Sequence, residues 1–455
     1  MARQALTPME DVSGFAATHP GGEDVIEEHH GKDASEVYNS VHGPKLAMSY
    51  FGLTKLIGRI PVLAPAQNEA KSLENPKLIK NLPPLESIIS LQDFEDAARS
   101  CLNERSWVYV SGASNDCYTA SKNTEMYQSV FLRPRVCRPI SQVDTSTAIL
   151  GHRFQVPIFN APASLAMLTH PSAEVGLAKG LSASGSTIIV PTLASYSLGE
   201  VAEGLPQNHP FFFQLYIPRD PSALAKLLEE IRRASPVAVM VTVDLPVFSK
   251  REANERYEMR MAKEKGNSKD NKQKKKQSRA ASAAISPDVT WTQIQTIKEK
   301  LGIPIFIKGI QCAEDAMKAF ESGCEGIYIS NHGGRGVDTS QPALLTLAEI
   351  NIKYPTLLSK MSVFIDGGIR RGTDVFKAIC LGAHGVCLGR PFFYALMYGE
   401  DGVRHLMNIL RDELENAMQL CGTQCLSEAH PGFLNTKALV SMVDTGEVLN
   451  MGSKL

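Results

Sequence analysis

The sequence lacks the features that mark membrane proteins, disulfide-linked secreted proteins and nucleic-acid-binding proteins. No apolar run approaches the roughly 18 residues of a membrane span, and residues 1–30 show neither an apolar signal core nor an Arg-rich presequence. The formal net charge of -1 gives no overall attraction to nucleic acid or to an anionic membrane. The nine cysteines are scattered, and the close pair Cys421 and Cys425 has no second pair or histidine cluster to complete a zinc site. We therefore expect buried free thiols in a reducing compartment.

From about residue 156 the chain repeats a short apolar run, a polar or glycine-rich tip and a helical stretch. The apolar runs are nearly continuous in Val, Ile and Phe, which is typical of parallel strands buried on both faces. The predicted strands span residues 156–162, 186–192, 210–216, 238–244, 303–309, 326–334, 362–368 and 385–391. Eight such units favour an α/β fold of the (β/α)8 TIM-barrel type. A doubly wound open sheet is the alternative, although the glycine-rich turn that usually follows its first strand is missing.

The rest of the chain suggests a division into domains. Residues 1–52 form a separate N-terminal unit, residues 53–85 predict an extended linker, and residues 86–455 form the barrel domain. Within the barrel domain, residues 256–287 are largely polar and basic, so they predict a mobile loop. That loop is either a solvated insertion or a docking patch or lid. Residues 426–455 predict a C-terminal tail.

Polar residues gather at the carboxyl ends of the predicted strands, the edge at which TIM barrels carry their catalytic side chains. Glycine-rich turns with an arginine follow the seventh and eighth strands, a pattern that suits a phosphate group. His332 and Arg335 follow the sixth strand, and Asp244, across the mouth, can hold the imidazole as the third member of a triad does. Arg335 offers a planar cation suited to a carboxylate. Lys308 ends a buried strand, so its charge needs an anionic partner. That partner is either a carboxylate in a structural ion pair or a flavin ring that becomes negative on reduction.

The motifs SNHGGRGVD, DGGIRRGTDVFKA, LGRPFFYA, FFFQLY, VTVDLP and IPIFIKG together resemble the FMN-dependent L-2-hydroxy-acid oxidase and dehydrogenase family. That family includes glycolate oxidase and the flavocytochrome L-lactate dehydrogenases, and the resemblance runs from about residue 83 to 425. It implies FMN as cofactor, oxidation of a small 2-hydroxy acid to the 2-oxo acid, and oxygen or a cytochrome as the electron acceptor. It also implies a homotetramer.

The same resemblance implies roles for single residues. His332 is the expected base, and Asp244 is its partner. Arg335 and Tyr109 would hold the substrate carboxylate, while Tyr216 would bond the substrate hydroxyl. Arg251 and Leu193 would flank the substrate. The expected FMN contacts are Ala163, Ser164, Thr192, Gln214, Thr242, Lys308, Asp366, Gly367, Gly368, Arg370, Gly389 and Arg390.

Two departures from the family pattern lie at the end of the second predicted strand. Pro191 stands where the family often has a serine that bonds the flavin, so that contact is lost or moves to Thr192. Leu193 stands where glycolate oxidases carry a tryptophan. The smaller side chain favours lactate or a larger 2-hydroxy acid over glycolate.

Residues 11–52 resemble the middle of a b-type cytochrome domain, with His19 and His42 as the expected haem ligands. Only about ten residues precede this segment, so the strands that normally come before it are expected to be absent. A truncated haem pocket and a relic that binds no haem are the two interpretations. The relic favours oxygen as the acceptor, and an intact haem domain favours a cytochrome.

The chain ends in Ser453-Lys454-Leu455, a tripeptide that predicts import into peroxisomes. A mitochondrial or cytoplasmic location is the alternative. Two further functions also stay open at this point: a phosphate-binding TIM-barrel isomerase or synthase without flavin, and a non-catalytic paralogue that acts as an interaction module.

Overall fold

The structure is a computed structural model that describes residues 6–10, 12, 15, 16, 19, 23–43, 45–47, 56–61, 81–264 and 284–443. The C-terminal tripeptide lies outside the described residues, as does the centre of the predicted basic loop, residues 265–283. All nine cysteines are free. None of the helices in the described ranges is long and apolar enough to span a membrane.

Eight parallel strands form the centre of the molecule, in the order β6-β13-β12-β11-β10-β9-β8-β7. Their bounds are β6 (Ile158–Asn160), β7 (Ile189–Pro191), β8 (Phe212–Leu215), β9 (Ala238–Thr242), β10 (Ile305–Ile310), β11 (Gly326–Ile329), β12 (Ser362–Ile365) and β13 (Gly385–Leu388). Each strand overlaps a predicted range. The (β/α)8 prediction is therefore confirmed, and the open-sheet alternative is wrong.

The ring of strands is completed by side chains where β6 meets β7. The Asn160 side chain donates to the carbonyl of Ile189 over 3.1 Å and accepts from the Ile189 N–H over 2.8 Å. The Ser186 hydroxyl also donates to the carbonyl of Ile158. The side-chain amide of Asn160 carries both a donor and an acceptor. It therefore joins β6 to β7 by hydrogen bonds, as backbone groups join the other neighbouring strands of the barrel.

The barrel interior is filled largely by aromatic rings. The ring of Phe364 lies 5.2 to 5.9 Å, between centroids, from those of Phe159, Phe212, Phe306 and Tyr328. All five side chains are fully buried. Such layers of large side chains make the barrel a packed core rather than a pore, so a ligand must bind above them at the carboxyl ends of the strands.

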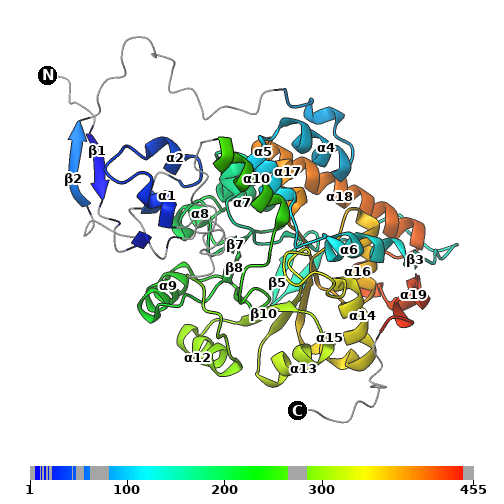
Figure 1. Ribbon diagram of the computed structural model, residues 1–455. Coiled ribbons are helices and arrows are strands. Elements are labelled where there is room, and N and C mark those ends of the chain that lie inside the picture. The colour runs from blue at the N-terminus through cyan, green and yellow to red at the C-terminus, as the bar shows by residue number, and fades with distance from the viewer. Residues whose placement is uncertain are drawn as a thin grey trace.

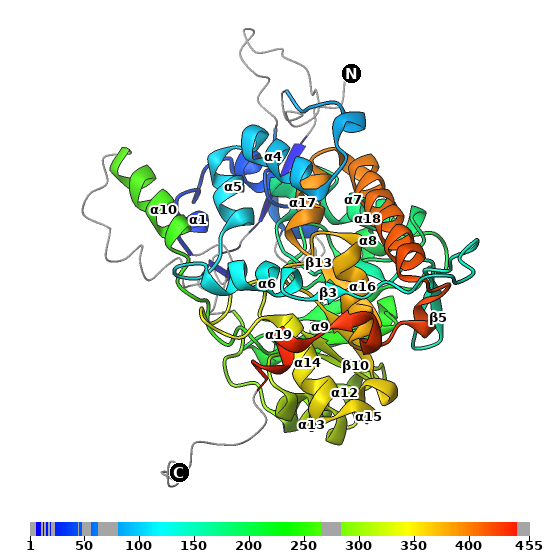
Figure 2. The same cartoon turned by 90° about the vertical axis from the view of Figure 1, so that its right-hand side faces the viewer.

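Helices surround the barrel (Figures 1 and 2). They are α7 (Ala173–Ala183), α8 (Leu198–Glu203), α9 (Pro221–Ala234), α12 (Trp291–Leu301), α13 (Ala313–Glu321), α14 (Ala343–Lys353), α15 (Pro355–Lys360), α16 (Gly372–Cys380), α17 (Arg390–Leu396) and α18 (Gly399–Cys421). The local sequence explains how they begin: α9, for example, follows the N-cap Asp220, whose carboxylate accepts from two backbone N–H groups, and has Pro221 in its first turn.

Further elements precede the barrel or connect its parts. They are η3 (Leu85–Ser87), α4 (Leu91–Cys101), α5 (Glu104–Ser111), α6 (Tyr118–Gln128), β3 (Phe131–Leu132), β4 (Thr147–Ile149), β5 (His152–Phe154), η4 (Ala166–Leu168), η6 (Leu426–Glu428), η7 (Pro431–Phe433), β14 (Leu434–Asn435) and α19 (Lys437–Val440). Because β14 pairs with β3, the prediction of a tail from residue 426 is wrong for the described residues up to 443.

The N-terminal unit contains β1 (Leu6–Glu10), α1 (Glu23–Glu27), α2 (Ser35–Asn39) and β2 (Leu56–Pro61). Antiparallel pairing of β1 with β2 corrects two predictions: a strand does precede residue 11, and residues 56–61 belong to this unit rather than to a linker. Figure 1 shows the unit in blue at the side of the barrel. The Gly43 N–H donates to the carbonyl of Ser195 over 2.6 Å, which joins the unit to the segment before α8.

The predicted basic loop is in part a helix. α10 (Glu252–Glu264) covers its first third, and Arg260 forms an ion pair of 2.5 Å with Glu104 of α5. Downstream, Ile285 forms a bridge with Pro218. The loop prediction is therefore wrong for residues 256–264 and 284–287, where contacts with other elements outweigh the polar composition.

Candidate active site

A cavity of about 1550 Å³ opens at the carboxyl ends of the barrel strands. It is larger than the roughly 300–1,000 Å³ of common ligand pockets, so it has room for a cofactor and a substrate together. All predicted site residues line it except Thr242 and Asp244. Those two lie just behind the wall, where each bonds a residue that does line it.

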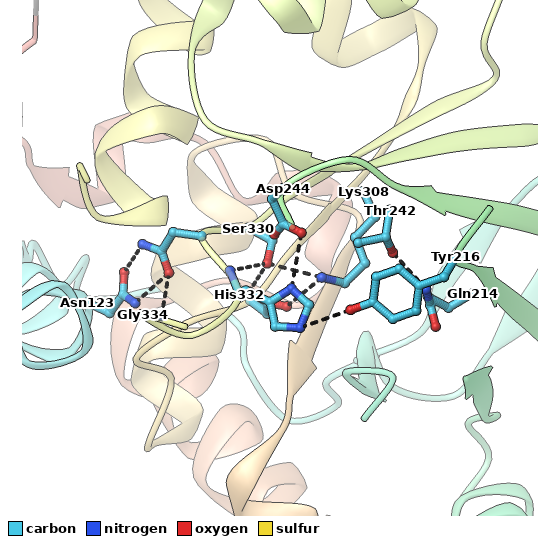
Figure 3. A network of polar contacts seen from close by, with 11 residues as sticks. Asn123, Gln214, Tyr216, Thr242, Asp244, Lys308, Ser330, His332 and Gly334 are labelled. Atoms are coloured by element: carbon cyan, nitrogen blue, oxygen red, sulfur yellow. Dashed lines mark hydrogen bonds and ion pairs between the residues drawn. The ribbon is translucent and has the colours of Figure 1, made fainter. Parts of the chain in front are cut away.

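His332 stands at the centre of the site in a strained loop (Figure 3). Its φ of 59° is left-handed, and Gly333 and Gly334 follow with φ of 63° and 78°. Left-handed backbone is unfavourable for a residue with a side chain, so the surrounding contacts must hold it. The Ser330 hydroxyl accepts the His332 N–H over 2.9 Å. The Nδ1 atom lies 3.1 Å from an Asp244 carboxylate oxygen, and Nε2 lies 3.4 Å from the Tyr216 hydroxyl.

The environment leaves His332 uncharged, with the lone pair of Nε2 toward the Tyr216 hydroxyl. Burial lowers the pKa of His332, Asp244 acts to raise it, and Lys308 acts to lower it, with the net result below the ordinary value. Burial alone would raise the pKa of Asp244, but Lys308 and His332 hold it below its ordinary value. The ionised carboxylate therefore accepts Nδ1–H, which leaves the lone pair on Nε2 at the cavity. Such an imidazole can take up a proton, and Asp244 can stabilise the resulting cation.

Two tyrosines face this imidazole and Arg335. The Tyr216 hydroxyl is almost wholly buried, and burial raises its pKa, so it stays protonated. The Arg335 guanidinium carbon lies 5.2 Å from the centroid of the Tyr109 ring, and Arg335 donates to the Tyr109 carbonyl. Tyr109 itself donates to the carbonyl of Ser164 over 3.3 Å. The structure thus brings Tyr109, Tyr216, His332 and Arg335 together, as the sequence predicted.

Three arginines make the cavity a site for anions. Burial, with the nearby Arg335 next, lowers the pKa of Arg251 to about 9, and the same two causes lower the pKa of Arg390. In the described part of the chain, the buried Nε atoms of Arg251, Arg335 and Arg390 have no hydrogen-bond partner. Buried guanidiniums that repel one another and keep unused donors are stabilised by a bound carboxylate or phosphate.

Lys308 lies in the floor of the cavity. Its Nζ is 3.3 Å from the Ser330 hydroxyl, 3.9 Å from Asp366 and 4.9 Å from the centroid of the Tyr328 ring. Ser330 in turn donates to Asp366 over 2.7 Å. Among the described residues, this buried Nζ has one carboxylate within 4.0 Å, that of Asp366, and its charge also lowers the pKa of Asp244. Such a cation suits a flavin ring whose reduced form carries negative charge.

Polar side chains of neighbouring strands line the wall beside Lys308. The Gln214 amide donates to the Thr242 hydroxyl over 2.9 Å and accepts from the Thr192 N–H over 3.2 Å. The Thr192 hydroxyl donates to the Gln214 carbonyl and accepts from the Tyr216 N–H. Since its one proton is already used, Thr192 has no donor left for the flavin contact that Pro191 cannot make.

The glycines and arginines predicted to bind a phosphate all line the cavity. Gly367, Gly368 and Gly389 line the cavity, and an added Cβ at Gly389 would meet only Ala161, at 3.8 Å. Arg370, however, pairs with Glu95 over 2.7 Å and with Gln92, both on α4. Arg390 donates to the carbonyls of Gly112 and Gly333. Both guanidiniums line the cavity and already have partners within the protein.

The same cavity extends to the N-terminal unit, where His19 and His42 line it. Their ring centroids lie 6.2 Å apart. With metal–nitrogen bonds of about 2 Å, this separation has room for one metal ion between the rings. Burial, with His19 next, lowers the pKa of His42 to about 4, and within the described residues its buried Nδ1 has no hydrogen-bond partner. Neutral imidazoles at this separation fit the axial ligands of a haem.

Three residues for which the sequence indicated no role, Asn123, Ser330 and Asn331, hold the His332 loop in place. Asn123 of α6 forms a buried amide pair with Asn331, and the Ser330 hydroxyl links His332, Lys308 and Asp366. Ser330 and Asn331 directly precede His332 in the motif SNHGGRGVD, but no role was assigned to them. Asn123 lies in a polar helix with no local signal of its partner, 208 positions away.

Comparison with known proteins agrees with this geometry. Residues 98–436 match the FMN-dependent dehydrogenase family, and residues 11–70 match the cytochrome b5-like haem/steroid-binding domain. The chain belongs to the FMN-dependent dehydrogenase family. Membership implies FMN as the cofactor, and the cavity with its three arginines and Lys308 fits that group.

Individual relatives point the same way. An L-lactate dehydrogenase (cytochrome) of Saccharomyces cerevisiae is 36% identical over 449 residues, covering 94% of this chain and 76% of its own. A peroxisomal (S)-2-hydroxy-acid oxidase of Oryza sativa subsp. japonica is 34% identical over 357 residues, 76% of this chain and 94% of its own. A mutant flavocytochrome b2 with pyruvate bound superposes with a TM-score of 0.73 at 37% identity, covering 80% of this chain and 90% of that one.

These findings establish the activity at the level of the family. The protein is an FMN-dependent enzyme that oxidises an L-2-hydroxy acid and passes the electrons to oxygen or a cytochrome. The alternatives of a flavin-free isomerase and of a non-catalytic paralogue are therefore set aside. The match of residues 11–70 also shows that the cytochrome-like unit extends past the predicted boundary at residue 52.

Proposed function

We propose that the protein is an L-lactate-type 2-hydroxy-acid dehydrogenase that uses His332 as its base and a cytochrome as its electron acceptor. The observation that carries the catalytic part is the Asp244–His332–Tyr216 chain of contacts beside Arg335. The observation that carries the acceptor is the pair of imidazoles, His19 and His42, in the wall of the same cavity.

The roles of the residues follow from their geometry. Arg335 binds the substrate carboxylate, with Tyr109 against its guanidinium, and so fixes the α-carbon in one orientation. Tyr216, which keeps its proton, bonds the substrate hydroxyl. His332 takes a proton at Nε2, and Asp244 stabilises the imidazolium through Nδ1–H. FMN, when bound, supplies the two-electron acceptor.

The residues that would hold FMN line the cavity or, like Thr242, bond a residue that does. Gln214 would bond the ring from the wall, with Thr242 behind it as its hydrogen-bond partner, and Lys308 would stabilise the negative charge of the reduced ring. The Gly367–Gly368 turn and Gly389 would receive the phosphate through backbone N–H groups. Arg370 and Arg390 would close on it after exchanging their present partners.

The substrate pocket supports lactate over glycolate. Leu193 lines the cavity and packs beside Tyr216. An aliphatic side chain there accommodates the methyl group of lactate and offers no hydrogen-bond donor. The S. cerevisiae relative, which aligns with 94% of this chain, is an L-lactate dehydrogenase (cytochrome).

We also propose that the N-terminal unit binds haem through His19 and His42. Haem, when bound, would supply a one-electron carrier beside the FMN site. This proposal departs from the relic interpretation because β1 pairs with β2 and the family match spans residues 11–70. A homotetramer, from family resemblance, and a peroxisomal location, from Ser453-Lys454-Leu455, complete the proposal. Light scattering and imaging of a fusion with and without the tripeptide test these two points.

The test of function is a visible spectrum of the purified full-length chain followed by anaerobic addition of substrate. We expect flavin bands together with a Soret band, and faster bleaching of the flavin with L-lactate than with glycolate. Reduction of added cytochrome c should exceed oxygen uptake. A spectrum without a Soret band, combined with rapid peroxide formation, would replace the cytochrome acceptor by oxygen.

A further inference from the structure

Helix α6 is tied to the loop that carries His332 by a buried pair of side-chain amides. The Asn123 amide nitrogen donates to the Asn331 oxygen over 2.9 Å, and the Asn331 amide nitrogen donates to the Asn123 oxygen over 2.8 Å. Both residues are 1% exposed. Figure 3 shows Asn123 pointing from α6 toward Gly334, with His332 next to it in the same loop.

The two amides also hold the backbone that follows His332. The Asn331 oxygen accepts the Gly334 N–H over 3.1 Å, and its nitrogen donates to the Gln341 carbonyl over 3.2 Å. The Asn123 oxygen accepts the Ala343 N–H over 3.2 Å. Since every one of these partners is fixed, neither amide can turn over without placing like groups together. The turn with three successive left-handed residues is therefore held at its base by Asn331, and Asn331 is held by Asn123.

Asn123 also forms the support of the Gly367–Gly368 turn. An added Cβ at Gly367 would lie 3.1 Å from the Asn123 amide nitrogen, and one at Gly368 would lie 2.3 Å from the Asn123 backbone. Both glycines have left-handed φ, at 92° and 84°. Asn123 thus bonds the loop of the proposed base through its side chain, and lies against the turn proposed to receive the FMN phosphate through its side chain at Gly367 and its backbone at Gly368.

A second tether fixes the far end of the same loop. The Asp338 carboxylate accepts the Thr119 N–H over 2.9 Å and the Asp116 N–H over 3.0 Å at the start of α6. The loop is therefore held on α6 at two points, and Asn123 acts at the point nearer to His332.

We propose that Asn123 is a positioning residue that keeps His332 and Arg335 in register with the Gly367–Gly368 turn. The inference rests on the role of His332 proposed above. Its consequence is that loosening one amide of α6, in the lining of the cavity, misplaces the base and the substrate-binding guanidinium together.

The test compares Asn123→Ala and Asn123→Asp with the control Asn351→Ala. Asn123→Asp keeps the shape and the acceptor oxygen but sets a second oxygen against that of Asn331. Asn351 of α14 donates one amide hydrogen bond to the Leu381 carbonyl over 3.1 Å and does not line the cavity, so we expect its loss to affect stability alone. Each holoenzyme is measured for kcat per bound FMN, KM, FMN dissociation constant, Tm and hydrogen exchange over residues 330–341.

We expect kcat per bound FMN to fall on the order of 10- to 100-fold in both Asn123 variants, the size of effect that a misplaced catalytic group produces. KM should rise, FMN should bind more weakly, and exchange of the Gly334 amide should accelerate. The control should lower Tm and leave kcat unchanged.

Wild-type kcat per bound FMN in both Asn123 variants overturns the proposal, whether or not Tm falls. Loss of kcat without faster exchange over residues 330–341 overturns it as well. The role of His332 itself is tested separately. If His332 is not the base, the His332→Gln enzyme will be active, whatever the Asn123 variants do.

Discussion

At the scale of single residues, the site depends on an imidazole whose charge state is set by its neighbours. Burial and Lys308 lower the pKa of His332, while Asp244 and Asp366 act to raise it, and the net value lies below the ordinary one. A base must be unprotonated to act, so kcat/KM should be lost only as pH falls below the ordinary range of a histidine.

Replacing His332 by Gln should leave FMN bound and abolish most of its reduction by substrate. Glutamine preserves a polar side chain of similar reach but cannot take up a proton, so we expect a loss of about 10²–10⁴-fold. The measurement is anaerobic stopped-flow bleaching of the flavin, with the visible spectrum reporting bound FMN. Wild-type reduction rates in this variant would remove His332 from the mechanism.

Replacing Asp244 by Asn should move the acid limb of kcat/KM to lower pH and lower its plateau. The limb moves down because the carboxylate raises the pKa of His332 and the amide does not. The plateau falls, by roughly 10- to 100-fold, because the side chain that orients the imidazole is lost. A pH–rate profile of both enzymes decides the point. An acid limb that moves to higher pH would contradict the assigned electrostatics.

At the scale of elements, the strands could be predicted because each is an apolar run buried on both faces. Composition did not predict the secondary structure of segments that are stabilised by contacts with distant parts of the chain. α10 is polar, yet its Arg260 pairs with Glu104 of another helix, and β2 is paired with β1 from the start of the chain. Neither partner is visible in the local periodicity, so both segments were predicted as irregular.

The closure of the barrel between β6 and β7 gives a prediction at this scale. Asn160→Ala removes two hydrogen bonds to Ile189, so we expect a loss of about 2–3 kcal/mol in the free energy of unfolding, near twice the loss for one bond. Denaturant unfolding of the apoprotein measures it. Asn351→Ala, which removes one amide hydrogen bond, is the control. Equal losses in the two variants would show that Asn160 does not close the barrel.

At the scale of the whole molecule, the N-terminal unit meets the barrel at a glycine. The Gly43 N–H bonds the Ser195 carbonyl, and an added Cβ would lie 2.6 Å from the Tyr196 ring. Gly43 follows His42 directly, so this contact fixes where the imidazole pair stands relative to the cavity.

Gly43→Ala should weaken this contact and leave the barrel intact. We expect unchanged flavin reduction by substrate, slower reduction of added cytochrome c, and faster proteolysis of the N-terminal unit. Gly199→Ala is the matched control, because an added Cβ at Gly199 meets nothing within 4 Å. Equal cytochrome c rates for the two variants would show that the contact does not govern electron delivery.

The sequence by itself determined the barrel, the order of its strands and most of the cavity lining. It did so because buried parallel strands require continuous apolar runs, and because catalytic residues follow directly at the strand ends. The tertiary structure decided how these residues are held. Asp244 meets His332 across 88 positions, and Asn123 meets Asn331 across 208. It also decided that Arg370 turns to Glu95 and that residues 56–61 join the N-terminal unit. Such partners are set by three-dimensional proximity, which local spacing along the chain does not encode.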